Sequence, residues 1–153
     1  MADANNAIST LNNLIQTCKD GENGFNEAAQ GVSSADLKDV FMRYSQQRSQ
    51  FAGELQDAVS KIGGNPETSG SIAASLHRGW IDIKSAVSGQ DEGAILSECE
   101  RGEDSAVAAY QSALKEALPS DVNSVVERQY QQVKEAHDRI KGLRNMSNSA
   151  SAS

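Results

Sequence analysis

Four stretches of the chain repeat apolar residues at the three- and four-residue spacing of an α-helix. They cover about residues 7–30, 35–62, 91–118 and 120–144. A helix with one apolar stripe is stable when that stripe is buried, and four long helices bury their stripes together in a bundle. The spacing therefore predicts an all-α fold built on four long helices.

The composition also favours helices over strands. Only Pro66 and Pro119 interrupt the chain, aromatic residues make up 5%, and long stretches are rich in Ala, Glu, Gln, Lys and Leu. A length of 153 residues suits a single domain with a sizeable core. We expect residues 1–144 to form that domain and the Ser/Asn/Ala-rich residues 145–153 to form a disordered polar tail.

The connection between the second and third long helices is too long for a simple turn. It carries apolar residues at helical spacing, namely Ile72, Leu76, Trp80, Ile83 and Val87. This pattern predicts a short additional helix near residues 71–87, in a crossover that takes the chain back along the bundle. His77 lies on this segment, where we expect a surface imidazole and not a ligand.

Polar residues break each long apolar stripe near its middle. An ionised side chain in a helical core is costly unless it is paired, hydrogen-bonded, protonated or bound to a cation. We therefore predict a buried polar layer, made up of Glu22, Gln47, Arg48, Gln50, Glu103, Gln129 and Gln132. Such a layer could be a structural network that fixes how the helices align, or a metal site.

Di-iron and di-manganese bundles use one Glu from each of two helices and a Glu-x-x-His pair from each of the other two. Glu22 and Glu103 could supply the single carboxylates. The matching pair positions hold amides instead: Gln47 with Gln50, and Gln129 with Gln132. Neutral amides bring no negative charge and are poor ligands for redox iron. We therefore expect no cofactor, with iron or manganese at Glu22 and Glu103 as the alternative.

An arginine could satisfy a buried carboxylate without any metal. Arg48, Arg101 and Arg128 lie within a residue or two of the polar layer, and we expect guanidinium groups to neutralise Glu22 and Glu103. The chain has only two histidines and no Gly-rich phosphate loop, so nucleophilic catalysis is hard to assemble. We expect no enzymatic activity; the alternative is a ferroxidase-like reaction at two metal ions.

Charge and hydropathy restrict the partners. A net charge of −7 argues against nucleic acid, and no apolar run reaches the length of a membrane span. Without a signal-peptide pattern, and with Cys18 and Cys99 on apolar helical faces as free thiols, we expect a cytoplasmic protein. An unknown protein partner or a homodimer remains open, since the third long helix offers small residues for close packing: Ala106, Ala108, Ala109 and Ala113.

Four stretches, in this order, resemble a bacterial family of ferritin-like four-helix-bundle proteins known only as a domain of unknown function: residues 19–25, 48–55, 98–104 and 129–138. The resemblance spans residues 8–143. It implies a ferritin-like bundle with a long crossover after the second helix, small stress-associated cytoplasmic members, and no established activity. Both Glu-x-x-His positions of true ferritins are changed here, which argues against iron oxidation. The leading prediction is a non-enzymatic structural or interaction protein, and a carboxylate metal-binding protein is the alternative.

Overall fold

The protein is an all-α bundle, as the apolar spacing predicts. Our computed structural model describes residues 2–67 and 80–152, and these contain helices and no strands. The helices are α1 (Ala2–Gly31), α2 (Ala35–Lys61), α3 (Ile83–Ser88), α4 (Glu92–Leu114) and α5 (Ser120–Ala152). Four of them are long, and α3 is a single short piece in the crossover between α2 and α4.

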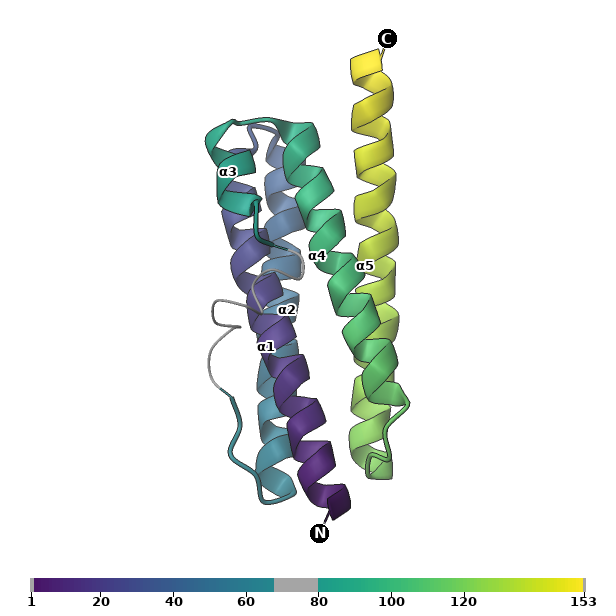
Figure 1. Cartoon of the computed structure of the whole chain (residues 1–153). Coiled ribbons are helices and arrows are strands. Elements are labelled where there is room, and N and C mark those ends of the chain that lie inside the picture. The colour runs from purple at the N-terminus through teal and green to yellow at the C-terminus, as the bar shows by residue number, and fades with distance from the viewer. Residues whose placement is uncertain (1, 68–79, 153) are drawn as a thin grey trace.

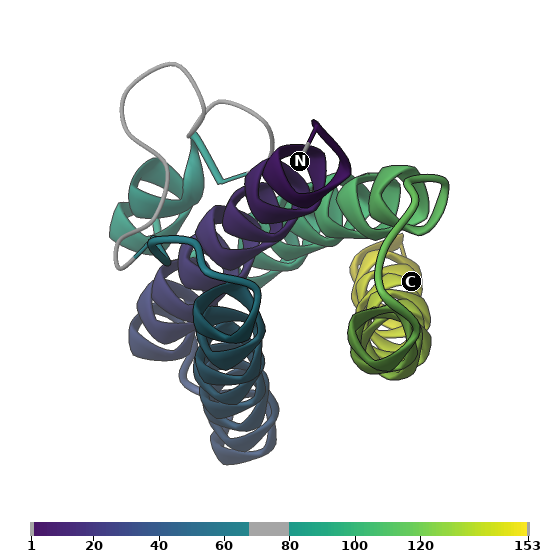
Figure 2. The same ribbon diagram turned by 90° about the horizontal axis from the view of Figure 1, so that it is seen from below.

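The long helices form two antiparallel hairpins. Figure 1 shows α1 rising and α2 descending, and then, after the crossover, α4 descending and α5 rising. The hairpins meet mainly through α1 and α4, and α2 contacts α5 least. Viewed from below, α2 and α5 lie on one side of the bundle and α1 and α4 on the other (Figure 2). One long crossover in a four-helix bundle is also the connectivity of ferritin-like folds.

α1 begins at Ala2, five residues before the predicted start, whereas local capping explains why α2 and α4 begin close to the predicted positions. The Ser34 hydroxyl accepts a hydrogen bond from the Leu37 amide at 3.3 Å, and the Asp91 carboxylate accepts one from the Ala94 amide at 3.3 Å. At its other end, α4 stops at Leu114, four residues before the predicted end. The residues between lead into Pro119, which disfavours helical geometry in the residue that precedes it.

Two regions differ from expectation, the C-terminal segment and the crossover. α5 continues through Ala152, so residues 145–152 are helical where we expected a disordered tail. Nothing in that stretch breaks a helix, since it has neither proline nor glycine and the nearest glycine is Gly142. Of the crossover helix expected near 71–87, the described part shows a turn at residues 80–82 and a helix over Ile83–Ser88. Residues 68–79, which include His77, lie outside the described part of the chain.

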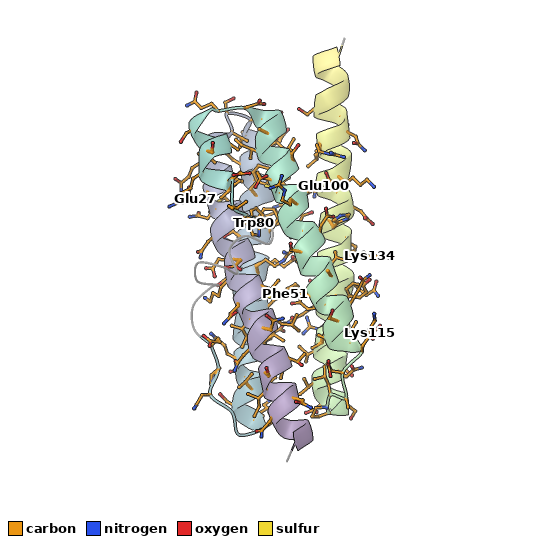
Figure 3. The ribbon with its side chains drawn as sticks, viewed as in Figure 1. Glu27, Phe51, Trp80, Glu100, Lys115 and Lys134 are labelled. Atoms are coloured by element: carbon orange, nitrogen blue, oxygen red, sulfur yellow. The ribbon has the colours of Figure 1, made fainter. Side chains whose placement is uncertain are left out.

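The core consists of two apolar clusters stacked along the bundle. One surrounds Phe51 and Leu55, and the other surrounds Phe25, Phe41 and Trp80. Figure 3 shows the labelled Phe51 and Trp80 at these two levels. α2 and α4 each cross from one cluster to the other near their middles, and charged side chains lie at that crossing. The candidate site is built there.

Candidate functional site

A buried ion pair joins the two hairpins. Arg48 on α2 donates to Glu103 on α4 through both terminal nitrogens, Nη1 to Oε1 at 2.5 Å and Nη2 to Oε2 at 2.7 Å. The side chains are 1% and 0% exposed, respectively. A two-point contact between guanidinium and carboxylate is the strongest geometry such a pair can adopt. Both oxygens of the only fully buried carboxylate in the described residues are thereby engaged.

The surroundings of Arg48 are shaped to hold a guanidinium. Gly21 of α1 faces it, and a Cβ added there would lie 3.3 Å from Arg48 Cγ and Nη1. The Phe25 ring centroid lies 5.5 Å from Arg48 Cζ, within cation–π range, and Arg48 Nε donates to Gln47 Oε1 at 3.2 Å. Burial alone would lower the pKa of the Arg48 guanidinium. Attraction to the Glu103 carboxylate outweighs this effect and raises that pKa above its usual value.

A second polar group lies around Gln129 of α5. Tyr110 Oη donates to Gln129 Oε1 at 2.7 Å, and Gln129 Nε2 donates to Glu54 Oε1 at 2.9 Å and to the Phe51 carbonyl at 3.3 Å. Gln129 is 0% exposed, so these bonds satisfy both ends of its amide. The group therefore ties α5 to both α2 and α4.

Cys18 of α1 completes this second group. Its sulfur lies 3.2 Å from Tyr110 Oη, and it is not disulfide-bonded. Burial raises the pKa of the Cys18 thiol to about 11 and raises the pKa of Tyr110 well above its usual value. Both groups are therefore protonated near neutral pH, which removes the thiolate that nucleophilic or redox chemistry needs.

The polar residues predicted as one layer are split between two levels. Glu103 and Tyr110 are seven residues apart on α4, which is about 10 Å along a helix. Arg48 and Glu103 form the upper group, while Gln129 belongs to the lower one. Gln47 is half-buried and contacts Arg48.

Three other residues predicted for the layer lie away from its centre. Gln50 is exposed and Gln132 is half-buried. Glu22 is not in the core, because its side chain is 29% exposed and pairs with Lys19 Nζ at 3.2 Å. The inward position on α1 at this level is taken by Gly21, one residue earlier, so α1 offers Arg48 a bare backbone and not a carboxylate. Glu22 and Glu103 are therefore not a facing pair.

Two buried or bonded carboxylates were not identified by the sequence analysis. Glu98 is 6% exposed, accepts a hydrogen bond from the Asp82 amide at 3.1 Å and lies 3.3 Å from Arg101. Its i, i+3 spacing to Arg101 was the available signal. Glu54 of α2 pairs with Arg128 of α5 at 2.8 Å and also accepts a hydrogen bond from Gln129. Residue spacing within one helix does not predict these contacts, because the partners lie on different helices.

A histidine bridges α4 and α5 at the surface. His137 Nε2 lies 2.6 Å from Asp104 Oδ1, and His137 Nδ1 lies 3.2 Å from Asp138 Oδ1. Burial lowers the pKa of His137, but its hydrogen bonds to the two carboxylates outweigh this and raise the pKa above its usual value. His137 thus has one carboxylate partner from each helix, Asp104 of α4 and Asp138 of α5.

Residues 2–67 and 80–152 offer no clustered ligands for a metal ion. No group of three or more His, Cys, Asp or Glu side chains there is placed to hold a metal ion. The two candidate carboxylates, Glu22 and Glu103, each contact a basic side chain instead. Both oxygens of Glu103 are engaged by Arg48, and Oε1 of Glu22 is engaged by Lys19.

A cavity of about 530 Å³ lies between α1 and the start of the described crossover segment. Its lining combines carboxylates, amides, a lysine and apolar groups: Asp20, Asn23, Gly24, Asn26, Glu27, Trp80, Ile81, Ile83 and Lys84. The lining is therefore mixed in charge and polarity.

Three further findings bear on identity. No described helix has both the length and the apolar character needed to cross a membrane. No curated protein matches the chain. A sequence model of the family described as "Domain of unknown function (DUF2383)" matches residues 6–116, which include nearly all of α1 and the whole of α2, α3 and α4. With most of its length matched, the chain belongs to the DUF2383 family, whose description assigns no function.

Proposed function

We propose that this protein is a non-enzymatic bundle with a structural or interaction role. The observation that supports this most directly is the occupation of Glu103 by Arg48 through both carboxylate oxygens, at 2.5 and 2.7 Å. A metal ion at this position would have to displace a buried guanidinium and leave its charge without a partner. The nearby Cys18 and Tyr110 are held protonated, which adds no nucleophile.

The rival proposal is a carboxylate protein that binds or oxidises iron or manganese. It is motivated by two carboxylates on core-forming helices, Glu22 and Glu103. It is weakened by their separate environments, because Glu22 is partly exposed beside Lys19 and Glu103 is sealed against Arg48. Dinuclear sites also need further ligands that the glutamines at the matching positions do not replace.

Metal analysis separates these proposals. We expect protein purified from iron- and manganese-supplemented cells to hold no stoichiometric metal, and Fe²⁺ or Mn²⁺ to leave its melting temperature unchanged. Stoichiometric, tightly held iron would overturn the proposal. So would a metal-dependent rise in melting temperature that disappears in both Glu22→Gln and Glu103→Gln but persists in Glu135→Gln, a control at an exposed position.

The interaction role leaves a homodimer or another protein as partner. Ala106 and Ala113 are already buried in the protein's own core, whereas Ala108 is exposed and Ala109 is half-buried, so less of α4 is free for a dimer than its composition suggests. Sedimentation velocity across a concentration series tests the dimer, which a monomer at every concentration would exclude.

The cellular setting is part of the same proposal. Free, buried cysteines support a reducing compartment such as the cytoplasm. A role in the stress response rests on the family resemblance alone. It predicts a higher level of the protein in stressed than in unstressed host cells, and equal levels would count against it.

A further inference from the structure

Trp80 lies directly against the backbones of two helices. A Cβ added at Gly24 of α1 would be 2.3 Å from the indole ring, and one added at Gly102 of α4 would be 2.2 Å from it. Real Cβ atoms do not approach other heavy atoms this closely, so the ring occupies space that any other residue type at either position would fill. The two glycines thus form a slot between α1 and α4, and Trp80 fills it.

The slot lies beside the buried ion pair. Gly102 immediately precedes Glu103 on α4. On the other side, the Phe25 ring contacts both Trp80, with centroids 5.0 Å apart and edge to face, and Arg48, whose Cζ lies 5.5 Å from the ring centroid. Phe25 therefore connects Trp80 to Arg48 by direct contact with each.

Trp80 belongs to a segment that is attached to the bundle without being one of its long helices. We call residues 80–88 the strap. Its apolar contacts come from Trp80, Ile83, Ala86 and Val87. The methyl groups of Val87 would lie 2.9 and 3.0 Å from a Cβ added at Gly31. The seven-residue separation of Trp80 and Val87 equals that of Gly24 and Gly31, so the strap runs alongside α1.

The polar attachments of the strap are few among the described residues. The Asp82 amide donates to Glu98 at 3.1 Å, and Arg101 lies 3.5 Å from the Asp82 carboxylate in an exposed pair. Exposed ion pairs contribute little stability. The helix within the strap, α3, has six residues, which is too short to be stable without its packing partners.

We propose that the strap opens as a local unit while the four long helices stay folded, and that Trp80 is the part of it that keeps water from the Arg48–Glu103 pair. Most residues of the strap are exposed, with only Trp80 and Ile83 buried, and segments with few buried residues open at a lower free energy than the whole fold does. Opening removes the ring from between Gly24 and Gly102. Water then reaches the α1–α4 seam, including Cys99, which is 0% exposed and packs in the same cluster as Trp80.

The wild-type protein carries its own probes for this event. Trp80 is the single tryptophan, so its fluorescence reports the strap alone, while circular dichroism at 222 nm reports the helices. Cys99 lies in the cluster under the strap, and Cys18 lies in the other cluster. We expect Trp80 fluorescence to change at lower urea concentration than the helical signal, and a thiol reagent in native buffer to modify Cys99 before Cys18. Coincident transitions and equal labelling rates would overturn the proposal.

A pair of matched glycine variants tests the slot itself. Gly102→Ala should push the indole out, shift its emission to longer wavelength and raise Cys99 labelling about tenfold. Gly53→Ala is the control, because it is also inside a long helix but has nothing within 4 Å of an added Cβ. Labelling of Gly102→Ala no faster than that of Gly53→Ala contradicts the proposal.

Trp80→Leu covers the case in which Gly102→Ala does not fold. It leaves every helix residue unchanged and shortens only the side chain that fills the slot, so the bundle should keep its helical signal. We expect Cys99 labelling to rise about tenfold while Cys18 labelling stays at its wild-type rate. An unchanged Cys99 rate, or an equal rise at both thiols, contradicts a local opening.

Discussion

The Arg48–Glu103 pair makes a strong and quantitative prediction about stability. In Glu103→Gln the shape of the side chain is kept, but the buried Arg48 charge loses its counter-charge. Removing one partner of a buried ion pair costs about 3–5 kcal/mol. For a protein of this size, about 2–4 °C of melting temperature is lost per kcal/mol, so we expect the melting temperature to fall by about 6–20 °C.

A second variant removes both charges of the pair at once. In the double variant Arg48→Met with Glu103→Leu, no charge is buried and the layer is filled with apolar groups of similar size. Replacements of this kind are neutral or stabilise by about 1–4 kcal/mol. We therefore expect the double variant to be at least as stable as the wild type, although Glu103→Gln alone is strongly destabilised.

Urea denaturation followed by circular dichroism measures both free energies. The control is Asp39→Asn, which breaks the Asp39–Arg43 pair at the surface, where the side chains are 62% and 72% exposed. That change should cost about 0.5 kcal/mol or less. A cost for Glu103→Gln as small as that of the control would refute the reasoning, since it would mean that water reaches the Arg48 charge.

Two further predictions concern the surface contacts of His137 and the buried hydrogen bond from Tyr110 to Gln129. Because the pKa of His137 is raised in the folded state, its contacts with Asp104 and Asp138 contribute stability below the unfolded-state pKa, about 6.5, and lose it as pH rises through the folded-state pKa. Thermal melts should therefore show a larger deficit of Asp104→Asn relative to wild type at pH 5.5 than at pH 8, and an equal deficit at both would argue against this linkage. Tyr110→Phe removes the donor to Gln129 Oε1 and should cost about 1–3 kcal/mol in urea denaturation; a neutral result would mean that Gln129 finds another donor.

Helical periodicity is enough to predict the four long helices and the all-α class. Apolar spacing decides which face of a long helix is buried, and capping residues such as Ser34 and Asp91 fix where helices begin. The strap was beyond that reasoning. Its conformation at residues 80–82 depends on a slot made by glycines on two other helices, and spacing within the strap contains no information about that slot.

The candidate site was accessible to sequence reasoning only in part. Interrupted apolar stripes indicate that Glu103 and Gln129 face the core, and the structure has both at 0% exposure. The same logic places Glu22 inward, but on α1 the adjacent Gly21 faces Arg48, because a glycine lets the large guanidinium approach the helix. Partners from other helices, such as Glu54 for Gln129, depend on how the hairpins dock and not on spacing within one helix.

The two charges of the buried ion pair come from different hairpins, and this affects how the bundle can assemble. Arg48 belongs to the α1–α2 hairpin and Glu103 to the α4–α5 hairpin, so neither half alone can bury its charge with a partner. While the halves are apart, water solvates both groups. A loosely docked intermediate, which excludes water before the two-point contact forms, carries the desolvation cost of both charges without the compensating attraction. Partly docked states therefore have a higher free energy. The two hairpins consequently dock more cooperatively than they would if only the apolar clusters held them together.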